Sequence, residues 1–410
     1  MGKTYFFTVL ALALALALAL AGCGGSSAPT SLRPLPLTAG AGSAQPHLAH
    51  TESGAVVLSW LEPDADATRL LVSRLGDGGW SEPAEVARGD DWFVNWADFP
   101  SVLPSDRGAW TAHWLQRRPE GGYAYDVVMA TSADVGANWQ TIGSPHDDGT
   151  PTEHGFVTLF PWDGGTGVIW LDGRETGGGG HSHGAQAAGG MTLRAARVAP
   201  DGSRDRETVL DELTCDCCQT DVTVATQGPV VVYRDRSRQE VRDIAVVRHD
   251  GTGWTEPKGV GVDGWVIEGC PVNGPAVDSS GESVVVAWFT AAQDRPRVRI
   301  AWSMDGGQHF EEAIEVPATA ALGRVDVVAI SERDAVISWL EQVEQHASLR
   351  LLRVSAEGEI GSVREVSRTA AGRPSGFPQM VRGGDGLVLA WTEVQGESRT
   401  VRAATLGLPD

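Results

Sequence analysis

The 410-residue sequence contains little cysteine, little positive charge and no sustained helical pattern. It has five cysteines, and its 32 lysine and arginine residues face 53 aspartate and glutamate residues, for a formal net charge of −21. A nucleic-acid partner needs lysine and arginine against its phosphates, so this charge argues against one and favours a soluble protein. Short apolar runs separated by glycine, aspartate and proline predict an all-β fold.

The longest apolar run lies at the N-terminus and indicates export. Residues 5–20 follow Lys3, are rich in alternating alanine and leucine, and lead into Cys23 through the letters LAGC. The run is shorter than the roughly 20 residues of a membrane span, so we interpret it as a secretory leader. Its ending resembles the bacterial lipobox. The resemblance implies a signal peptide over 1–22, acylation of Cys23, a flexible tether over 23–30, and a membrane-anchored protein of the cell envelope, expected at the outer membrane.

One short pattern recurs seven times, a β run that ends in an aromatic residue. The seven residues are Trp60, Trp114, Trp170, Tyr233, Trp288, Trp339 and Trp391, at intervals of 54, 56, 63, 55, 51 and 52 residues. A repeat of this length with four strands per unit predicts a single seven-bladed β-propeller over residues 31–410. The last unit lacks a fourth strand, so residues 31–39 are expected to close the ring as the outer strand of the last blade. Their prolines suit an edge strand.

Two turns follow the pattern S-x-D-x-G-x-x-[W/F], around Asp134 and Asp305. In such a turn aspartate accepts backbone N–H groups, and glycine takes a backbone angle that other residues avoid. The turns match the Asp box, and together with the repeats they make the chain resemble the BNR-repeat sialidase superfamily. The resemblance gives the two aspartates a structural role, and makes a six-bladed sialidase-type propeller the second choice of fold.

Three of the five cysteines lie in the stretch TCDCCQTD, at Cys215, Cys217 and Cys218. The repeat parse places them where the fourth blade begins, and Cys270 where the fifth begins. Family resemblance puts sialidase active sites on this face, the top face. Export favours disulfides, for instance from Cys217 or Cys218 to Cys270 between blades. A copper or zinc site and a catalytic or redox thiol are the alternatives. Neighbouring donors proposed for such a site are His181, His183, Met191 and His154.

The sialidase resemblance implies three carboxylate-binding arginines, a Tyr–Glu nucleophile pair and an aspartate acid/base, and the sequence matches this set only in part. No tyrosine follows Tyr233, although the family's nucleophile comes from a late blade. Four arginines are candidates for an anion-binding cluster: Arg174, Arg234, Arg236 and Arg324. Salt bridges between blades are the alternative for them. Asp172 and Asp235 are a candidate carboxylate pair for glycoside hydrolysis.

These patterns predict an exported, lipid-anchored propeller that binds a ligand or a soft metal on its top face without the full sialidase catalytic set. The alternative is a divergent exo-sialidase or other glycoside hydrolase, so the sequence leaves open whether the chain is an enzyme. The expected ligand is a carbohydrate or an anionic small molecule. Copper and zinc are the cofactors under consideration, and neither is certain.

Overall fold

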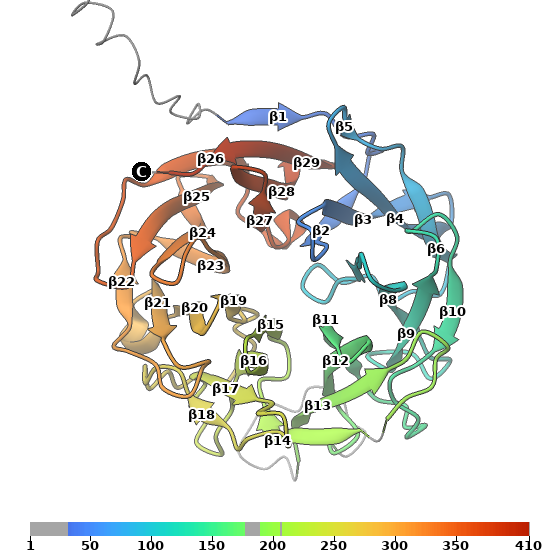
Figure 1. Cartoon of the computed structure of the whole chain (residues 1–410), viewed down its shortest axis with the longest axis horizontal. Helices are drawn as coiled ribbons and strands as arrows, with labels where there is room; N and C mark the ends of the chain where they lie inside the picture. The colour runs from blue at the N-terminus through green and yellow to red at the C-terminus, as the bar shows by residue number, and fades with distance from the viewer. Residues whose placement is uncertain (1–31, 177–188, 206, 410) are drawn as a thin grey trace, which may run out of the picture.

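The computed structural model describes residues 32–176, 189–205 and 207–409, and it is a ring of seven antiparallel sheets (Figure 1). Its regular elements within these ranges are 29 strands and two short 3₁₀ turns, η1 (Ala292–Asp294) and η2 (Arg373–Ser375). The described residues contain no helix long and apolar enough to cross a membrane. The all-β, seven-bladed prediction is confirmed, and the six-bladed alternative is wrong.

Each blade is one sheet, and its strands run outward from the centre in chain order. Blade 1 has β2 (Ala44–His50), β3 (Val56–Asp64), β4 (Ala67–Gly76), β5 (Gly79–Trp80) and β6 (Ala84–Gly89). Blade 2 has β7 (Ser101–Leu103), β8 (Trp110–Arg117), β9 (Tyr125–Ser132) and β10 (Gln140–Gly143). Blade 3 has β11 (His154–Trp162), β12 (Gly165–Asp172), β13 (Met191–Val198) and β14 (Thr208–Thr214). Blade 4 has β15 (Asp221–Ala225), β16 (Gly228–Arg234), β17 (Ile244–Arg248) and β18 (Lys258–Gly259).

The remaining three blades follow the same plan. Blade 5 has β19 (Ala276–Ser280), β20 (Ser283–Thr290), β21 (Arg297–Ser303) and β22 (Ile314–Val316). Blade 6 has β23 (Ala321–Ala329), β24 (Asp334–Val343), β25 (His346–Ser355) and β26 (Arg364–Ala370). Blade 7 has β27 (Gln379–Gly383), β28 (Gly386–Gln395) and β29 (Ser398–Gly407), and its fourth strand is β1 (Arg33–Leu35).

The N-terminal strand closes the ring, as the missing fourth strand of the last repeat predicts. Strand β1 pairs antiparallel with β29, with Arg33 opposite Thr405 and Leu35 opposite Ala403, and Figure 1 shows it on the outer rim. Its middle residue is Pro34, which is tolerated because an outermost strand has one edge without a ladder partner. The strand covers three residues of the predicted 31–39, and it joins the first described residues to the last blade.

The seven repeated aromatic residues form the core between blades. Each lies in the second strand of its blade, and all seven are buried: Trp60, Trp114, Trp170, Tyr233, Trp288, Trp339 and Trp391. Valine, leucine and isoleucine fill the neighbouring positions on both faces of these strands, which accounts for their continuous burial. Strands buried on both faces read as apolar runs rather than as a strict alternation. The repeat therefore reflects one packing unit used seven times.

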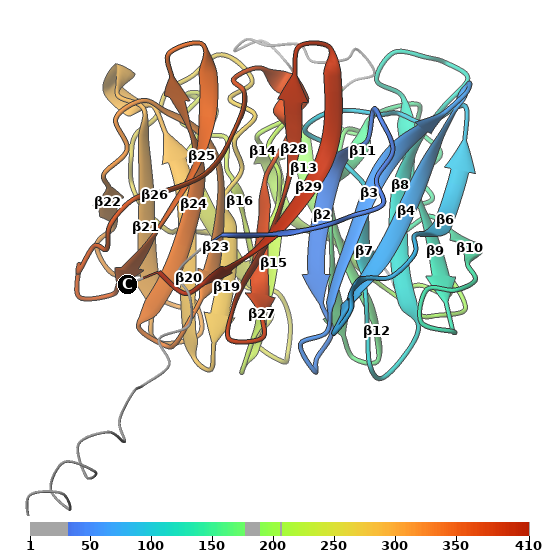
Figure 2. The same ribbon diagram turned by 90° about the horizontal axis from the view of Figure 1, so that it is seen from above.

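The loops of the propeller divide between two faces, as Figure 2 shows from the side. The top face holds the loops from second to third strands and those between blades, and the opposite face holds the turns from third to fourth strands. The Asp134 turn lies on the opposite face, where the aspartate accepts the Ser132 hydroxyl at 2.9 Å and the Asn138 N–H at 2.8 Å. The Asp305 turn repeats this arrangement, with the Ser303 hydroxyl at 2.8 Å. Both aspartates thus hold turns far from the top-face loops.

Candidate functional site

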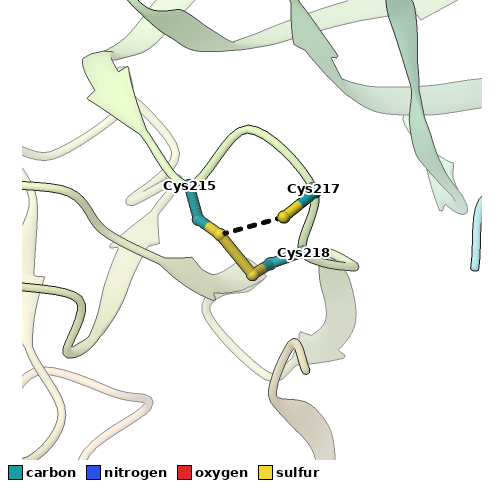
Figure 3. Close-up of side chains that lie close together, drawn as sticks. All are labelled: Cys215, Cys217 and Cys218. Atoms are coloured by element: carbon teal, nitrogen blue, oxygen red, sulfur yellow. Dashed lines mark hydrogen bonds between the residues drawn. A yellow bond between two sulfur atoms is a disulfide. The ribbon is translucent and has the colours of Figure 1, made fainter. Parts of the chain in front are cut away.

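The cysteine-rich stretch forms a turn between β14 and β15 on the top face, where blade 3 passes into blade 4. Cys215 and Cys218 form a disulfide within this turn, with their Cα atoms 5.8 Å apart (Figure 3). The structure therefore differs from the expected bridge between blades, because the tight turn brings these two residues within ordinary disulfide range of each other. Cys217, which is buried, and Cys270, which is exposed, remain as thiols.

The two thiols nevertheless meet, as the equivalent positions of their loops predict. Val272, two residues after Cys270, packs against the buried cluster that holds the cysteine turn. The neighbouring Cys270 thiol raises the pKa of Cys217, with burial acting in the same direction, and Cys217 in turn lowers the pKa of Cys270. Met191 packs in the same buried cluster as the cysteine turn.

The histidines proposed as further donors do not join this cluster in the described structure. His154 lies at the start of β11, where its ring stacks on His146 at 3.9 Å and its Nε2 lies 3.1 Å from Asp148. His181 and His183 lie outside the described residues. The copper or zinc hypothesis stays a prediction, although the disulfide uses two of the four sulfur atoms and structural zinc takes four ligands.

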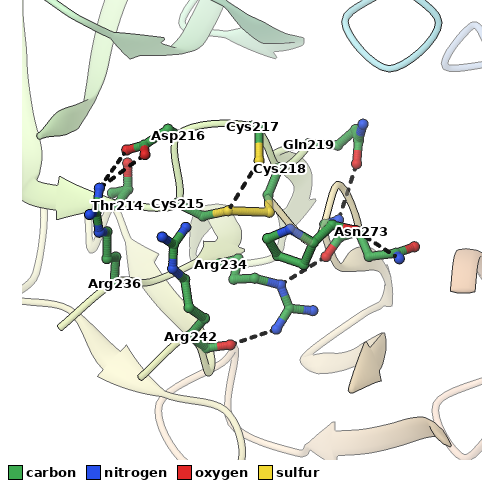
Figure 4. Close-up of a disulfide and its surroundings, with 12 residues drawn as sticks. Thr214, Cys215, Asp216, Cys217, Cys218, Gln219, Arg234, Arg236, Arg242 and Asn273 are labelled. Carbon is green, nitrogen blue, oxygen red and sulfur yellow. Dashed lines mark hydrogen bonds and ion pairs between the residues drawn. A yellow bond between two sulfur atoms is a disulfide. The ribbon is translucent and has the colours of Figure 1, made fainter. Parts of the chain in front are cut away.

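Arg236 and Arg234, two of the four candidate anion-binding arginines, are buried beneath the cysteine turn (Figure 4). Arg236 forms a two-point ion pair with Asp216, at 2.9 and 3.0 Å, and a second ion pair with Glu240 at 2.7 Å. Arg234 donates to three backbone carbonyl oxygens, those of Asn273, Arg242 and Phe289. The N–H donors of Arg234 and Arg236 are thus engaged by groups of the chain itself. This arrangement is the alternative to an anion-binding role that the sequence raised for these arginines.

The other two candidate arginines are engaged in the same way. Arg174 contacts three carboxylates, with Asp172 at 2.6 Å, Glu207 at 2.5 Å and Asp148 at 3.2 Å. Arg324 donates to the carbonyl oxygens of Gly372 and Gly376 and to the Ser375 hydroxyl, and its guanidinium lies 4.9 Å from the Trp96 ring centre. The geometry does not gather the four guanidinium groups around one open anion site.

Asp172 occupies a position that recurs around the ring. Its side chain accepts the Trp170 indole N–H at 2.8 Å, and in other blades Glu62 and Glu341 accept from the equivalent tryptophans, Trp60 and Trp339. Burial acts to raise the pKa of Asp172, but Arg174 and neighbouring donors hold it below its usual range. A carboxylate two residues after the repeated tryptophan therefore accepts that tryptophan's N–H as part of the blade structure, and Asp172 is one example.

Asp235 lies in the loop after β16, away from the Asp172 cluster of contacts. Its carboxylate accepts the Arg236 N–H at 2.6 Å, and burial, followed by the charge of Asp211, raises its pKa to about 6. It lines an open groove of about 730 Å³ with Asp211, Glu212 and Arg238. None of the described contacts brings Asp235 to Asp172, so the proposed pairing of these two residues has no geometric support.

A pocket of about 390 Å³ opens on the top face beside the cysteine turn, over blades 2 to 4. We call it the blade 3 pocket. It is lined by Glu120, Gly121, Gly122, Tyr123, Ala124, Pro151, Thr152, Glu153, Gly173, Thr176, Gly189, Gly190, Met191, Asp216 and Arg236. Tyr123 is 48% exposed and packs edge-on against Phe93, so part of its ring lies at the pocket surface. Such concave, partly apolar pockets with a few polar groups are where small ligands bind.

A buried chain of three acidic and phenolic groups supports the wall of this pocket. The Tyr125 hydroxyl lies 2.7 Å from Glu153 and 2.9 Å from Asp98, and Asp98 accepts the Phe156 N–H at 2.7 Å. Burial raises the pKa of Glu153 to about 8, against the opposing hydrogen bond from Tyr125. Burial likewise raises the pKa of Asp98 to about 7. At neutral pH Glu153 is therefore a carboxylic acid at the pocket surface.

Sequence reasoning missed Glu153, Tyr125 and Asp216 as members of one site. Asp98 precedes the second blade, and its partners come from separate segments of blades 2 and 3. A signal was present in the glycine at 155, where an added Cβ would lie 2.0 Å from Asp98. The backbone there approaches the carboxyl group so closely that only glycine fits.

The central channel is a second cavity, of about 230 Å³, and its acidic residues link the blades. Asp221, Asp278 and Asp326 each accept a backbone N–H from the lead strand of the following blade, at 2.8, 2.8 and 2.5 Å. Burial raises the pKa of Asp221 to about 7 and also raises the pKa values of the other two. These contacts give the three half-buried aspartates a structural role between neighbouring blades.

Comparisons with known proteins establish the fold. No family model and no curated protein matches the sequence. A polysaccharide lyase, the PL25 ulvan lyase bound to -[GlcA(1-4)Rha3S]-, matches over 88% of this chain and 91% of its own, with a TM-score of 0.56 and 11% identity. The Trypanosoma rangeli sialidase bound to the inhibitor DANA matches over 80% of this chain, with a TM-score of 0.50 and 14% identity.

The match spans 56% of the sialidase chain, so it covers little more than half of that protein. Identities this low show a shared fold and do not show a shared reaction. The seven-sheet ring is a property of this chain, and the two solved structures share its propeller fold. The chain is a seven-bladed propeller of the sialidase-like fold.

Proposed function

We propose that the blade 3 pocket binds a carbohydrate chain and cleaves a glycosidic bond by acid–base chemistry. The observation that carries the proposal is a pair of carboxyl groups in one pocket with opposite environments. Glu153 is kept protonated by burial, whereas Asp216 is ion-paired with Arg236. Environments that separate two carboxyl groups in this way are typical of acid and base assignments in glycosidases.

In the proposed reaction Glu153 donates its proton to the leaving oxygen of the glycosidic bond. Its pKa of about 8 keeps it protonated at neutral pH, and the Tyr125 hydroxyl holds its Oε1 in place. Asp216, fixed on Arg236, accepts a proton from an attacking water, whose oxygen bonds to the anomeric carbon as the bond to the leaving oxygen breaks. General acid catalysis of this kind contributes roughly 10²- to 10⁴-fold.

The charges around the pocket favour a neutral saccharide. Three carboxyl groups, those of Glu120, Glu153 and Asp216, line it, and the guanidinium of Arg236 is already shared between Asp216 and Glu240. An acidic sugar would need free arginine donors of the kind that bind carboxylates in pairs. The exposed Tyr123 ring offers an apolar surface against which a sugar ring packs.

The test is a panel of fluorogenic neutral glycosides and sialosides with the wild type and Glu153→Gln. We expect turnover of a neutral glycoside, a loss of at least 100-fold in kcat in Glu153→Gln, and a fall in wild-type activity above pH 8. Glu357→Gln is the control, because Glu357 is an exposed residue paired with Arg333, away from the pocket. Absence of both turnover and glycan-array binding in the folded wild type would refute the proposal.

The ligand-binding hypothesis from the sequence placed cysteines and arginines at the centre, and the proposal moves the centre to the adjacent pocket. Copper or zinc binding by the cysteines stays a prediction that metal analysis of the purified protein tests. Export and acylation at Cys23, which lies outside the described residues, are likewise proposed. Radiolabelled palmitate should be incorporated into the wild type and not into Cys23→Ser.

A further inference from the structure

The cysteine turn and the Cys270 loop are locked together by their backbones. The Gly274 N–H donates to the Gln219 side chain at 3.1 Å, and Gln219 in turn donates to the Ala97 carbonyl at 2.7 Å. A Cβ at position 274 would lie 2.1 Å from the Gln219 carbonyl oxygen, so only glycine allows this approach. The meeting of Cys217 and Cys270 is therefore imposed by the packing of two blade-joining loops.

Cys217 stands between two sulfur partners. Its Sγ lies 4.0 Å from Cys215 Sγ of the disulfide (Figure 3), and the Cys270 thiol of the neighbouring loop lies close enough to raise its pKa. Cys217 is 7% exposed, whereas Cys270 is exposed on the top face. A pair with one accessible and one buried thiol has the arrangement of an attacking and a resolving cysteine.

Arginine charge lies beneath this pair. Arg242 is fully buried, and Figure 4 shows its guanidinium directed toward the cysteine turn. One of its nitrogens donates to Glu240 at 2.8 Å, while its Nε and Nη1 have no hydrogen-bond partner among the described residues. Buried donors without partners are rare and call for an explanation. A negative charge on the sulfur pair explains the two unpartnered donors of Arg242. The positive charges of Arg242 and Arg236 both act to lower the pKa of the Cys270 thiol.

We propose that Cys270 and Cys217 form a thiol–disulfide exchange site that reduces disulfide-bearing molecules at the top face. The Cys270 thiolate attacks one sulfur of the substrate disulfide, whose S–S bond breaks and whose other half leaves as a thiolate. Cys217 then loses its proton to the solvent and attacks Cys270 Sγ, which releases the second substrate thiolate. The products are two substrate thiols and a Cys217–Cys270 disulfide, so two electrons pass from the cysteine pair to the substrate.

This activity is independent of the proposed glycosidase chemistry, because it uses neither Glu153 nor a sugar. The Cys215–Cys218 disulfide takes no part in the electron count. It closes the turn that carries Cys217 toward the Cys270 loop.

The test uses the protein purified without reductant and dialysed against a metal chelator, with 5,5′-dithiobis(2-nitrobenzoic acid) as the disulfide probe. The wild type should release two equivalents of thionitrobenzoate, retain none, and yield a Cys217–Cys270 disulfide on peptide mapping with Cys215–Cys218 unchanged. Cys217→Ser should release one equivalent and keep a mixed disulfide on Cys270. Cys270→Ser should react at least 100-fold more slowly, because its remaining thiol is buried.

Three results would overturn the proposal. The first is a stable mixed disulfide on Cys270 of the wild type beside a free Cys217. The second is an undiminished rate in Cys270→Ser. The third is stoichiometric copper or zinc that blocks both thiols before dialysis, which would assign the pair to metal binding. Should a serine variant fail to fold, the product mapping of the wild type still decides between exchange and inertness.

Discussion

Removal of the N-terminal strand should destabilise the whole ring, because β1 supplies the fourth strand of blade 7. The perturbation compares a chain that begins at residue 32 with one that begins at residue 40. The shorter chain loses three partly buried leucines, Leu32, Leu35 and Leu37, which pack against the cores on either side of the last blade. It also exposes the edge of β29 from Ala403 to Thr405.

The magnitude follows from the buried apolar surface. Full burial of a leucine stabilises by roughly 1.5–3 kcal/mol, so three half-buried leucines contribute about 3 kcal/mol. The hydrogen bonds between β1 and β29 add to this stabilisation, whereas the conformational entropy lost on ordering β1 opposes it. An unfolding entropy of about 2.1 cal/mol/K per residue then converts 3 kcal/mol into a Tm decrease of about 4 °C for a domain of this size.

Differential scanning calorimetry of the two chains measures this decrease directly. The exposed β29 edge should also make the shorter chain associate at high concentration, which light scattering detects. A Tm within 1 °C of the longer chain, with no association, would show that β1 does not hold the ring closed.

Three further predictions concern the framework and its acidic groups. Asp172→Asn should lower the free energy of unfolding in urea by about 1–3 kcal/mol, because a buried ion pair is broken. Any glycoside turnover should change less than threefold. A loss of turnover at unchanged stability would restore Asp172 as a catalytic candidate. Asp134→Ala should cost about 1 kcal/mol, as for a lost capping residue, and leave probe release at the cysteines unaltered. The free energy of unfolding should fall as the pH rises from 6.5 to 8. Asp98, Asp221 and Glu153 have folded-state pKa values of about 7, 7 and 8, so in this interval the folded chain holds protons that the unfolded chain has already lost. A urea midpoint that rises over this interval would contradict these assignments.

The fold was predictable because one packing unit repeats in the sequence. The tryptophan or tyrosine of each second strand is large, buried and regularly spaced, so the seven blades could be counted before any contact was known. Ring closure was also predictable, since the last repeat lacks a strand and a short proline-containing segment precedes the first. The face of the cysteine turn followed from the same repeat, and so did its approach to Cys270.

The candidate site was less predictable because its chemistry depends on contacts between distant segments. Residue type alone cannot tell an arginine that binds a ligand from one such as Arg234, whose donors meet three backbone carbonyls. The pairing of Cys215 with Cys218 depends on the shape of one turn. Glu153 acquires its unusual protonation from burial against Tyr125 and Asp98, two residues from another blade.

The protonation of Glu153 is the central claim, and infrared difference spectroscopy measures it without any substrate. Spectra of the wild type minus Glu153→Gln, recorded from pH 5 to 10, isolate the carbonyl band of this one carboxylic acid. We expect the band to be present at pH 7 and to disappear with a midpoint of about pH 8, the pKa of Glu153. A band that is already lost by pH 6 would mean that Glu153 is an ordinary carboxylate, and the proposed acid would be refuted.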